Sequence, residues 1–212
     1  MKLLFNTIII LLLIQCSFEQ KQEEDDALVS LVALDILSTS SNQSGEDTAL
    51  DKVTTTQESS NVFVSNVNAS STKNWVFISL QSGGTQVLST GAWDIRIRRF
   101  LIGTNSGTSG SGSAGACDSG SVAFNSVSSL NCTIQVDSLQ SQDGGGFADV
   151  NDSANPALFN WYSYNNTILT AKNNVYLIRG TNGTSVFKLQ MMDYYSSSGT
   201  SGYPKFRWSR IN

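Results

Sequence analysis

The 212-residue sequence contains no histidine, and this absence removes the side chain that enzymes most often use as a general base. It also removes the Ser-His and Cys-His pairs of nucleophilic catalysis. Glutamate is absent after residue 60, so seven aspartates are the only acidic side chains of residues 61–212. We therefore expect a binding protein and not an enzyme.

Three of these aspartates leave two other kinds of site open. Asp143, Asp149 and Asp152 lie in the segment DGGGFADVND, and carboxylates used in pairs are typical of acid–base hydrolysis. The same oxygen ligands suit Ca²⁺, although their spacing does not match an EF-hand loop. Aspartate is also common in turns, so an ordinary surface loop is the simplest interpretation.

Long hydrophobic runs are scarce, and one lies at the N-terminus. Lys2 precedes a mostly apolar run from Leu3 to Ile14, which is the arrangement of a secretory signal and is shorter than the roughly 20 residues of a membrane span. Leu13 to Cys16 then resembles a bacterial lipobox, although Gln15 replaces the usual small residue. We expect residues 1–16 to be a lipoprotein signal peptide with Cys16 as the lipid anchor. A plain signal peptide is the alternative.

Cysteine is rare as well, and only Cys117 and Cys132 follow Cys16. Two cysteines are too few for a four-ligand zinc site. In an exported protein a disulfide between them is favoured over two free thiols. It would close a loop of about 15 residues.

Charge divides the chain after the signal. From Glu19 to Ser60, ten acidic side chains face two lysines, whereas residues 61–212 carry ten Lys and Arg against seven Asp. Residues 17–60 are predicted to be a flexible acidic tether, because Ser, Thr, Gln and acidic residues bury too little apolar surface to offset the ordering entropy. An apolar segment within it, Ala27 to Leu37, is a candidate short helix or packing segment. Residues 61–212 fit one domain.

Short runs rich in aromatic and β-branched residues, separated by Gly, Asn, Asp and Ser, predict an all-β domain. The clearest hairpin signal is Asn182-Gly183 between two apolar runs. The predicted strands span residues 62–67, 74–80, 85–89, 92–102, 122–125, 131–136, 158–164, 174–179, 185–195 and 205–211.

The segment 93–116, WDIRIRRFLIGTNSGTSGSGSAGA, joins an alternating strand to a run of small residues. Alternation predicts an apolar core face and a charged outer face, which consist of Trp93, Ile95 and Ile97 and of Asp94, Arg96 and Arg98, respectively. The doubled Arg98-Arg99 breaks the alternation and suggests a β-bulge. Residues 103–116 are predicted to be a loop, either flexible or close to a ligand.

Four segments carry a resemblance to the HmuY-like haem-binding proteins, which are bacterial surface lipoproteins. Residues 93–116 are similar to that family's Trp-Asp strand and the loop after it. The other three are VYLIRGTNGTSVFKLQMMDYY at 175–195, GYPKFRW at 202–208 and NWYSYN at 160–165. The resemblance covers most of residues 61–212 and implies a single HmuY-like antiparallel β domain that grips haem, for haem or iron acquisition at the cell surface.

The resemblance also raises the question of which side chains would bind the iron. The best-known members use two histidines and this chain has none, while some relatives are thought to use methionine. Candidate haem ligands are Tyr162, Tyr164, Met191 and Met192, and candidate propionate contacts are Arg96 and Arg98, with Arg99 and Lys172 as further cations. Packing is the simpler role for each of these tyrosines and methionines, and Met191 and Met192 fall on opposite faces of one strand.

The expected partners follow from the same resemblance. They are haem or a haem-carrying protein, the outer membrane through the lipid anchor, and an outer-membrane receptor; we expect no nucleic-acid partner. The alternative is a HmuY-fold surface lipoprotein that has lost haem ligation and binds another ligand or a host or envelope protein. The missing histidines favour this alternative.

Overall fold

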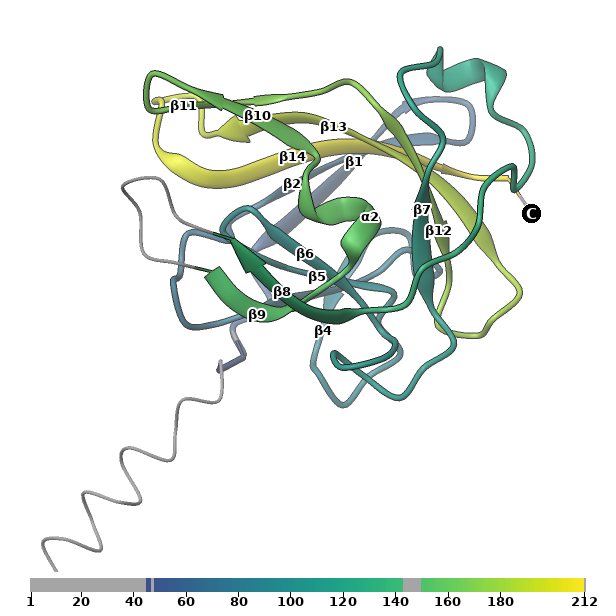
Figure 1. Ribbon diagram of the computed structural model, residues 1–212, viewed down its shortest axis with the longest axis horizontal. Helices are drawn as coiled ribbons and strands as arrows, with labels where there is room; N and C mark the ends of the chain where they lie inside the picture. The colour runs from purple at the N-terminus through teal and green to yellow at the C-terminus, as the bar shows by residue number, and fades with distance from the viewer. Residues whose placement is uncertain (1–44, 47, 143–149, 212) are drawn as a thin grey trace, which may run out of the picture. The chain divides into compact units, whose positions relative to one another are not determined.

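The protein is described from a computed structural model that covers residues 45–46, 48–142 and 150–211 (Figure 1). The predicted signal peptide, Cys16, Asp143, Asp149 and most of the tether lie outside these residues. Within the described part, no helix is both long enough and apolar enough to span a membrane.

The fold is all-β, as predicted, and every strand pair is antiparallel. The larger sheet has the order β1 (Val53–Ser59), β2 (Val62–Val67), β14 (Ser201–Arg210), β13 (Val186–Tyr195), β12 (Val175–Arg179) and β7 (Gly115–Asp118). The smaller sheet has the order β4 (Thr85–Val87), β3 (Val76–Ser79), β5 (Ile95–Arg98) and β6 (Leu101–Thr104). Two separate two-stranded sheets complete the fold. They are β8 (Ser138–Gln142) with β9 (Val150–Ala154) and β10 (Tyr162–Asn165) with β11 (Ile168–Ala171).

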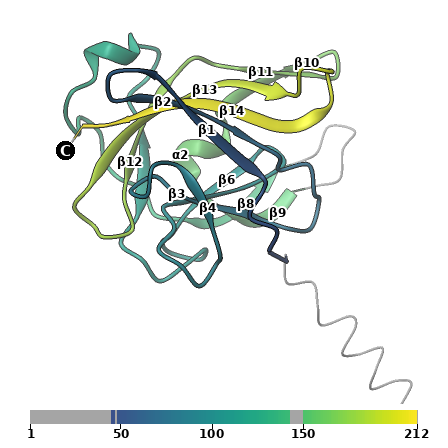
Figure 2. The ribbon, with the colours of Figure 1, turned by 180° about the vertical axis from the view of Figure 1, so that it is seen from behind.

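Figures 1 and 2 show the arrangement of the two main sheets, and apolar side chains from both sheets meet in one core. The smaller sheet contributes Val76, Ile78, Ile95, Ile97 and Ile102, and the larger sheet contributes Val67, Ile178, Phe187, Leu189, Met191, Phe206 and Trp208. Burial of this apolar area is the main stabilising contribution to the fold.

The smaller sheet is buried on its second face too. A separate cluster there contains Trp75, Phe77, Trp93, Leu101, Ala154 and Phe159. The predicted common face of Trp93, Ile95 and Ile97 is therefore wrong for Trp93, which precedes β5 and packs in this cluster, whereas Ile95 and Ile97 belong to the main core. The helical turn α2 (Pro156–Phe159) and the strand β9 supply Phe159 and Ala154. The predicted solvent-facing ladder of Asp94, Arg96 and Arg98 is therefore wrong, because this face is covered by residues far along the chain; Asp94 is 0% exposed and Arg96 is 9% exposed.

The single strand predicted for residues 92–102 is a hairpin. Arg98 pairs with Leu101, so Arg99 and Phe100 form a two-residue turn and not a β-bulge. Arg99 adopts a φ of 53°, and positive φ is what such tight turns require. The loop predicted at residues 103–116 is shorter in the structure, because residues 103 and 104 lie in β6 and residues 115 and 116 lie in β7. A Cβ on Gly103 would meet Asp137 Oδ2 at 2.7 Å, so this strand position requires glycine.

Three other predicted strands differ from the structure. Residues 122 and 123 have no regular structure, the 3-10 helix η1 (Phe124–Ser126) follows them, and residues 131–136 make one isolated bridge, at Gln135. Residues 158–164 begin in α2, whose first turn is capped by the Asn155 side chain and has Pro156 at its start. Turn chemistry and capping outweighed the apolar pattern in these segments.

The predicted tether does not extend to residue 60 in the structure. Strand β1 lies in that range and pairs with β2 along its length. Its sequence VTTTQES has a polar, mostly exposed pattern because β1 is an edge strand of the larger sheet. Its β-branched Thr and Val residues favour an extended strand despite that polarity.

The hairpin predicted at Asn182-Gly183 is confirmed. It joins β12 to β13, and the Asn182 side chain accepts hydrogen bonds from the backbone N–H groups of Thr184 and Ser185.

Candidate ligand-binding site

The two candidate tyrosines lie on the β10–β11 hairpin. Tyr162 is paired with Ala171 and Tyr164 with Leu169, so both tyrosines share the face that carries the buried Leu169. The Leu169 N–H donates a hydrogen bond to the hydroxyl of Tyr195, which ties the hairpin to β13. The hairpin lies beside the ends of β13 and β14 at the top of Figures 1 and 2.

The environments of the two tyrosines differ. The Tyr162 ring is half-buried and makes edge contacts with Phe100 at 5.5 Å and with Trp161 at 5.4 Å between centroids. Tyr164, nearer the tip of the hairpin, is 41% exposed. Packing accounts for the position of Tyr162, whereas Tyr164 presents its side chain at the surface.

The two methionines also differ in exposure. Met191 is 1% exposed and belongs to the main core, whereas Met192 is 40% exposed. The pairing of β13 with β14 shifts between Met191 and Asp193, as it does at a β-bulge, and bulges re-aim side chains. The structure therefore does not bring the two sulfur atoms to one point.

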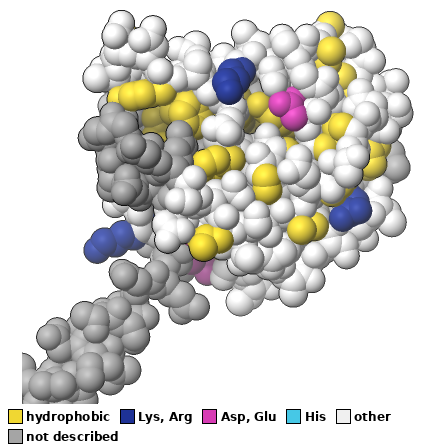
Figure 3. Space-filling view, viewed as in Figure 1, with side chains coloured by type: hydrophobic (Ala, Val, Ile, Leu, Met, Phe, Trp, Pro, Cys, Tyr) yellow, Lys and Arg dark blue, Asp and Glu magenta, His cyan; other side chains and the backbone are white. Residues whose placement is uncertain are grey.

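An aromatic cluster next to these candidates was not identified from the sequence. The Trp161 indole donates to the Phe100 carbonyl oxygen at 2.8 Å and lies 6.2 Å from the Tyr194 ring. Burial raises the pKa of Tyr194 to about 12, and the guanidinium of Arg99, 5.9 Å from the ring, opposes this rise. Hydrophobic side chains also appear at the upper left of Figure 3, in the region that β10 and β11 occupy in Figure 1.

The candidate propionate contacts have partners inside the domain. The guanidinium groups of Arg96 and Arg98 lie over the Trp75 ring, at 4.1 and 4.7 Å from its centroid. Arg98 also forms an ion pair with Asp152. A role with propionates stays a prediction for both arginines, and each already contributes to packing on the second face of the smaller sheet.

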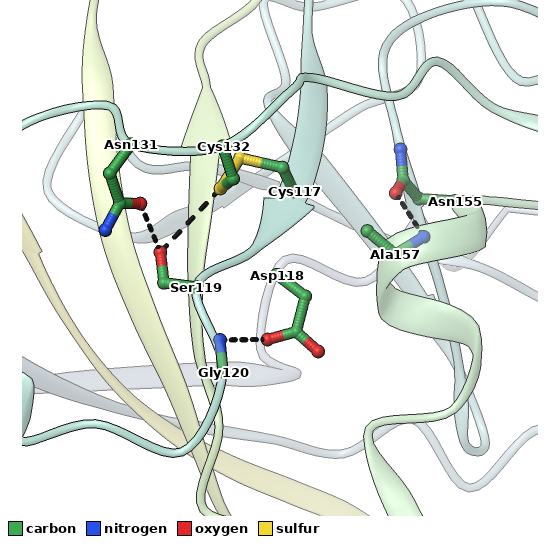
Figure 4. Close-up of a disulfide and its surroundings, with 8 residues drawn as sticks. All are labelled: Cys117, Asp118, Ser119, Gly120, Asn131, Cys132, Asn155 and Ala157. Carbon is green, nitrogen blue, oxygen red and sulfur yellow. Dashed lines mark hydrogen bonds between the residues drawn. A yellow bond between two sulfur atoms is a disulfide. The ribbon is translucent and has the colours of Figure 1, made fainter.

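The disulfide predicted between Cys117 and Cys132 is present (Figure 4). It joins β7 to the loop that follows η1, and the sequence separation is 15. The hydroxyl of Ser119 lies 3.7 Å from Cys132 Sγ and donates a hydrogen bond to Asn131 (Figure 4). These contacts fix a loop and do not form a reactive site.

The calcium and hydrolase alternatives concern residues that are only partly described. Asp152 is held by Arg98, while Asp143 and Asp149 lie outside the described residues. Across residues 45–46, 48–142 and 150–211, no three Cys, Asp or Glu side chains are placed to hold a metal ion.

Comparison with a library of protein families matches residues 71–208 to the family described as HmuY protein. A comparison with curated proteins gives no match.

Three solved structures share the fold. A candidate HmuY-like haem-binding protein from Bacteroides vulgatus is 16% identical, with a TM-score of 0.59 over 74% of this chain and 96% of that one. A candidate lipoprotein from Bacteroides fragilis is 18% identical, with a TM-score of 0.54 over 73% and 94%. An apo HmuY analogue from Tannerella forsythia is 15% identical, with a TM-score of 0.55 over 76% and 98%.

Proposed function

The chain belongs to the HmuY family, and from this premise we propose that it is a surface-anchored haem- or porphyrin-binding lipoprotein that takes part in haem or iron acquisition and ligates iron without histidine. Two of the structural relatives are described as candidates for haem binding and for a lipoprotein, which supports both parts of the proposal. We propose no enzymatic activity.

The exposure of the candidate side chains is the observation that ranks them as iron ligands, because a ligand must be reachable by haem. Tyr phenolate oxygen and Met sulfur are both known ligands of haem iron. Tyr164 and Met192 are 41% and 40% exposed, while Met191 is in the core and Tyr162 packs against Phe100 and Trp161. We therefore rank Tyr164 and Met192 above Tyr162 and Met191 as ligands. Trp161 and Tyr194 are buried, so the apolar surface for a porphyrin would come from the partly buried rings of Phe100, Tyr162 and Tyr195.

Attachment and partners complete the proposal. Cys16 would carry the lipid that holds the protein at the outer membrane, and a haem-carrying protein and an outer-membrane receptor would be its partners. Mass spectrometry of the N-terminal peptide from membrane fractions tests the anchor. A diacylated or triacylated Cys16 supports it, and an unmodified peptide that retains residues 1–16 contradicts it.

The haem proposal is tested by titrating the purified protein with haemin and recording absorbance in the oxidised and reduced states. A saturable, stoichiometric Soret shift is expected. If the spectrum is the same as that of a control protein without a haem site, haem binding is excluded.

Matched variants then identify the ligand. Tyr164→Phe and Met192→Leu are compared with Tyr162→Phe and Met191→Leu, which make the same chemical changes at the less exposed positions. We expect one of the first two to change the iron-linked spectrum and both of the second two to keep it, provided that circular dichroism shows them folded. A spectrum altered only by Tyr162→Phe or Met191→Leu would reverse the ranking.

The second candidate function is a HmuY-fold surface lipoprotein that no longer ligates haem and binds another ligand or a host or envelope protein. The chain has no histidine, and Arg96 and Arg98 are engaged with Trp75 and internal polar groups. Absence of a Soret shift in the haemin titration would favour this candidate.

A further inference from the structure

A cavity of about 470 Å³ lies between the smaller sheet and two loops. Strands β3 and β5, the β4–β5 loop and the β6–β7 loop form its walls. Its lining residues are Phe77, Ser89, Thr90, Gly91, Trp93, Arg96, Asn105, Ser109, Gly110 and Ser111. Volumes of this size are typical of small-molecule sites.

Arg96 is the one cation of this lining, and its side chain is 9% exposed. Its hydrogen bonds use Nη2 alone, which donates to Ser109 Oγ at 2.8 Å and to the Ser153 carbonyl oxygen at 2.9 Å. The buried Nε has no hydrogen-bond partner among the described residues. A guanidinium has five N–H donors, and Nη1 makes no hydrogen bond to a described residue either, so Nη1, and not the fully buried Nε, is the group that can donate to a ligand in the cavity.

The nearest acids do not neutralise Arg96 through an ion pair. Asp137 accepts hydrogen bonds from the Thr104 N–H at 2.8 Å, from the Thr104 hydroxyl at 2.5 Å and from the Asn155 side-chain amide at 3.0 Å. Asp152 is paired with Arg98. Burial lowers the pKa of Arg96, and the charges of Asp137 and Asp152 oppose this effect from a distance.

The remaining walls combine aromatic rings with hydroxyl and amide groups. Phe77 and Trp93 meet edge to face at 5.0 Å between centroids, and serine, threonine and asparagine surround them. The small residues of the β6–β7 loop make this arrangement possible. A Cβ on Gly110 would meet Asn105 Oδ1 at 2.2 Å and the Trp93 ring at 3.0 Å, so only glycine lets the loop backbone lie this close.

We propose that this cavity binds a small hydroxylated carboxylate such as a uronic acid. The carboxylate would accept hydrogen bonds from Arg96, the ligand hydroxyls would meet Asn105 and the serine and threonine side chains, and the carbon ring would face Phe77 and Trp93. The smaller sheet and its loops lie well below the β10–β11 hairpin in Figures 1 and 2, so this site is separate from the candidate iron ligands on that hairpin, and it assigns Arg96 to a ligand other than a haem propionate.

The test titrates the purified full-length protein with glucuronate, using calorimetry and tryptophan fluorescence. Saturable binding with a dissociation constant of about 1 mM or lower is expected. Glucose is the control ligand, since it has the same ring and hydroxyl groups without the carboxylate. Equal binding of glucose, or no saturation with glucuronate, would overturn the proposal.

Three variants locate the binding. Ser111→Trp should abolish it by filling the cavity, whereas Thr108→Trp, on an exposed residue of the same loop that does not line the cavity, should bind like the parent protein. Arg96→Gln should weaken binding by about tenfold or more. Should Arg96→Gln fail to fold, the two tryptophan variants decide: unchanged binding by Ser111→Trp rejects the cavity as the site.

Discussion

At the residue scale, one buried carboxylate holds three segments together. Asp94 is 0% exposed and accepts hydrogen bonds from the backbone N–H groups of Leu80 at 2.7 Å, Gln81 at 3.1 Å and Thr181 at 2.8 Å. Hydrogen bonds to a charged acceptor are stronger than neutral ones. Asp94 thereby joins the β3–β4 turn to the β12–β13 turn across the start of β5.

Replacing Asp94 with alanine should lower the free energy of unfolding by about 3 kcal/mol, because one buried and two partly buried N–H donors would lose a charged acceptor. Chemical denaturation measures this loss. The control is Asp118→Ala, which removes an exposed carboxylate that accepts from Gly120 N–H and Asn174. Similar losses in both variants would show that Asp94 has no special role.

A second prediction at the residue scale concerns alkaline pH. The pKa of Tyr194 is raised from 10.0 to about 12, so its neutral form is favoured by folding. This contribution to stability is present below pH 10 and is lost as the pH rises through about 12. The Tyr194→Phe variant should therefore lose less stability than the parent protein across this window.

Denaturation at a series of alkaline pH values tests this, with Tyr203→Phe as the control at a half-exposed tyrosine. Burial also raises the pKa of Tyr176, so the parent protein and the Tyr194→Phe variant should both lose some stability at alkaline pH. The contribution of Tyr194 is the difference between the stability–pH curves of the parent protein and the Tyr194→Phe variant. Parallel curves would contradict the prediction.

At the scale of elements, the loop closed by the disulfide depends on a few long-range contacts. It contains little regular structure beyond η1, yet Phe124 and Val127 are buried against Val175, Leu177 and Val186 of the larger sheet. Two cations lie near the Phe124 ring, with Lys188 Nζ at 4.7 Å and the Arg207 guanidinium at 4.6 Å from its centroid. Packing and cation–π contacts thus hold the loop on the sheet.

Replacing both Cys117 and Cys132 with serine should lower the free energy of unfolding by about 3 kcal/mol, since the disulfide restricts the unfolded chain across 15 residues. Denaturation with and without reductant measures the effect. Reductant should bring the parent protein to the stability of the double variant and leave that variant unchanged. Parent stability that is insensitive to complete reduction would contradict the prediction.

At the scale of the whole described domain, β1 completes the larger sheet. It covers the edge of β2, and its Val53 packs on the main core. The Thr55 hydroxyl also bonds to the Gly84 carbonyl oxygen, which links β1 to the turn before β4. The domain therefore needs residues that composition alone assigns to the tether.

This predicts different stabilities for two truncated proteins. A protein of residues 61–212 should be less stable than one of residues 45–212 by about 2 kcal/mol or more, because it loses the burial of Val53 and the pairing of β2. Denaturation of both measures the difference. Equal stability would place the domain boundary at residue 61.

Local patterns predicted the parts of this protein that depend on neighbouring residues. Strands β2, β12, β13 and β14, the Asn-Gly turn and the all-β class follow from β-branched and aromatic runs with turn residues between them. The family resemblance suggested a haem site, and the absence of histidine left tyrosine and methionine as the candidate ligand types. Alternation correctly put Met191 and Met192 on opposite faces of a strand, but it could not tell which of the two is buried, because that depends on which face of the sheet the rest of the chain covers.

The sequence by itself therefore determined the fold class, the hairpin at Asn182-Gly183 and the exclusion of histidine chemistry, because each depends on composition or on residues close together. Only the tertiary structure decided the burial of Asp94, the Arg96 cavity and the place of β1 in the sheet. Their partners are distant in sequence; Thr181, for example, lies 87 residues from Asp94. The free energy of such a side chain depends on which residues cover it, and that is settled only when the sheets pack together.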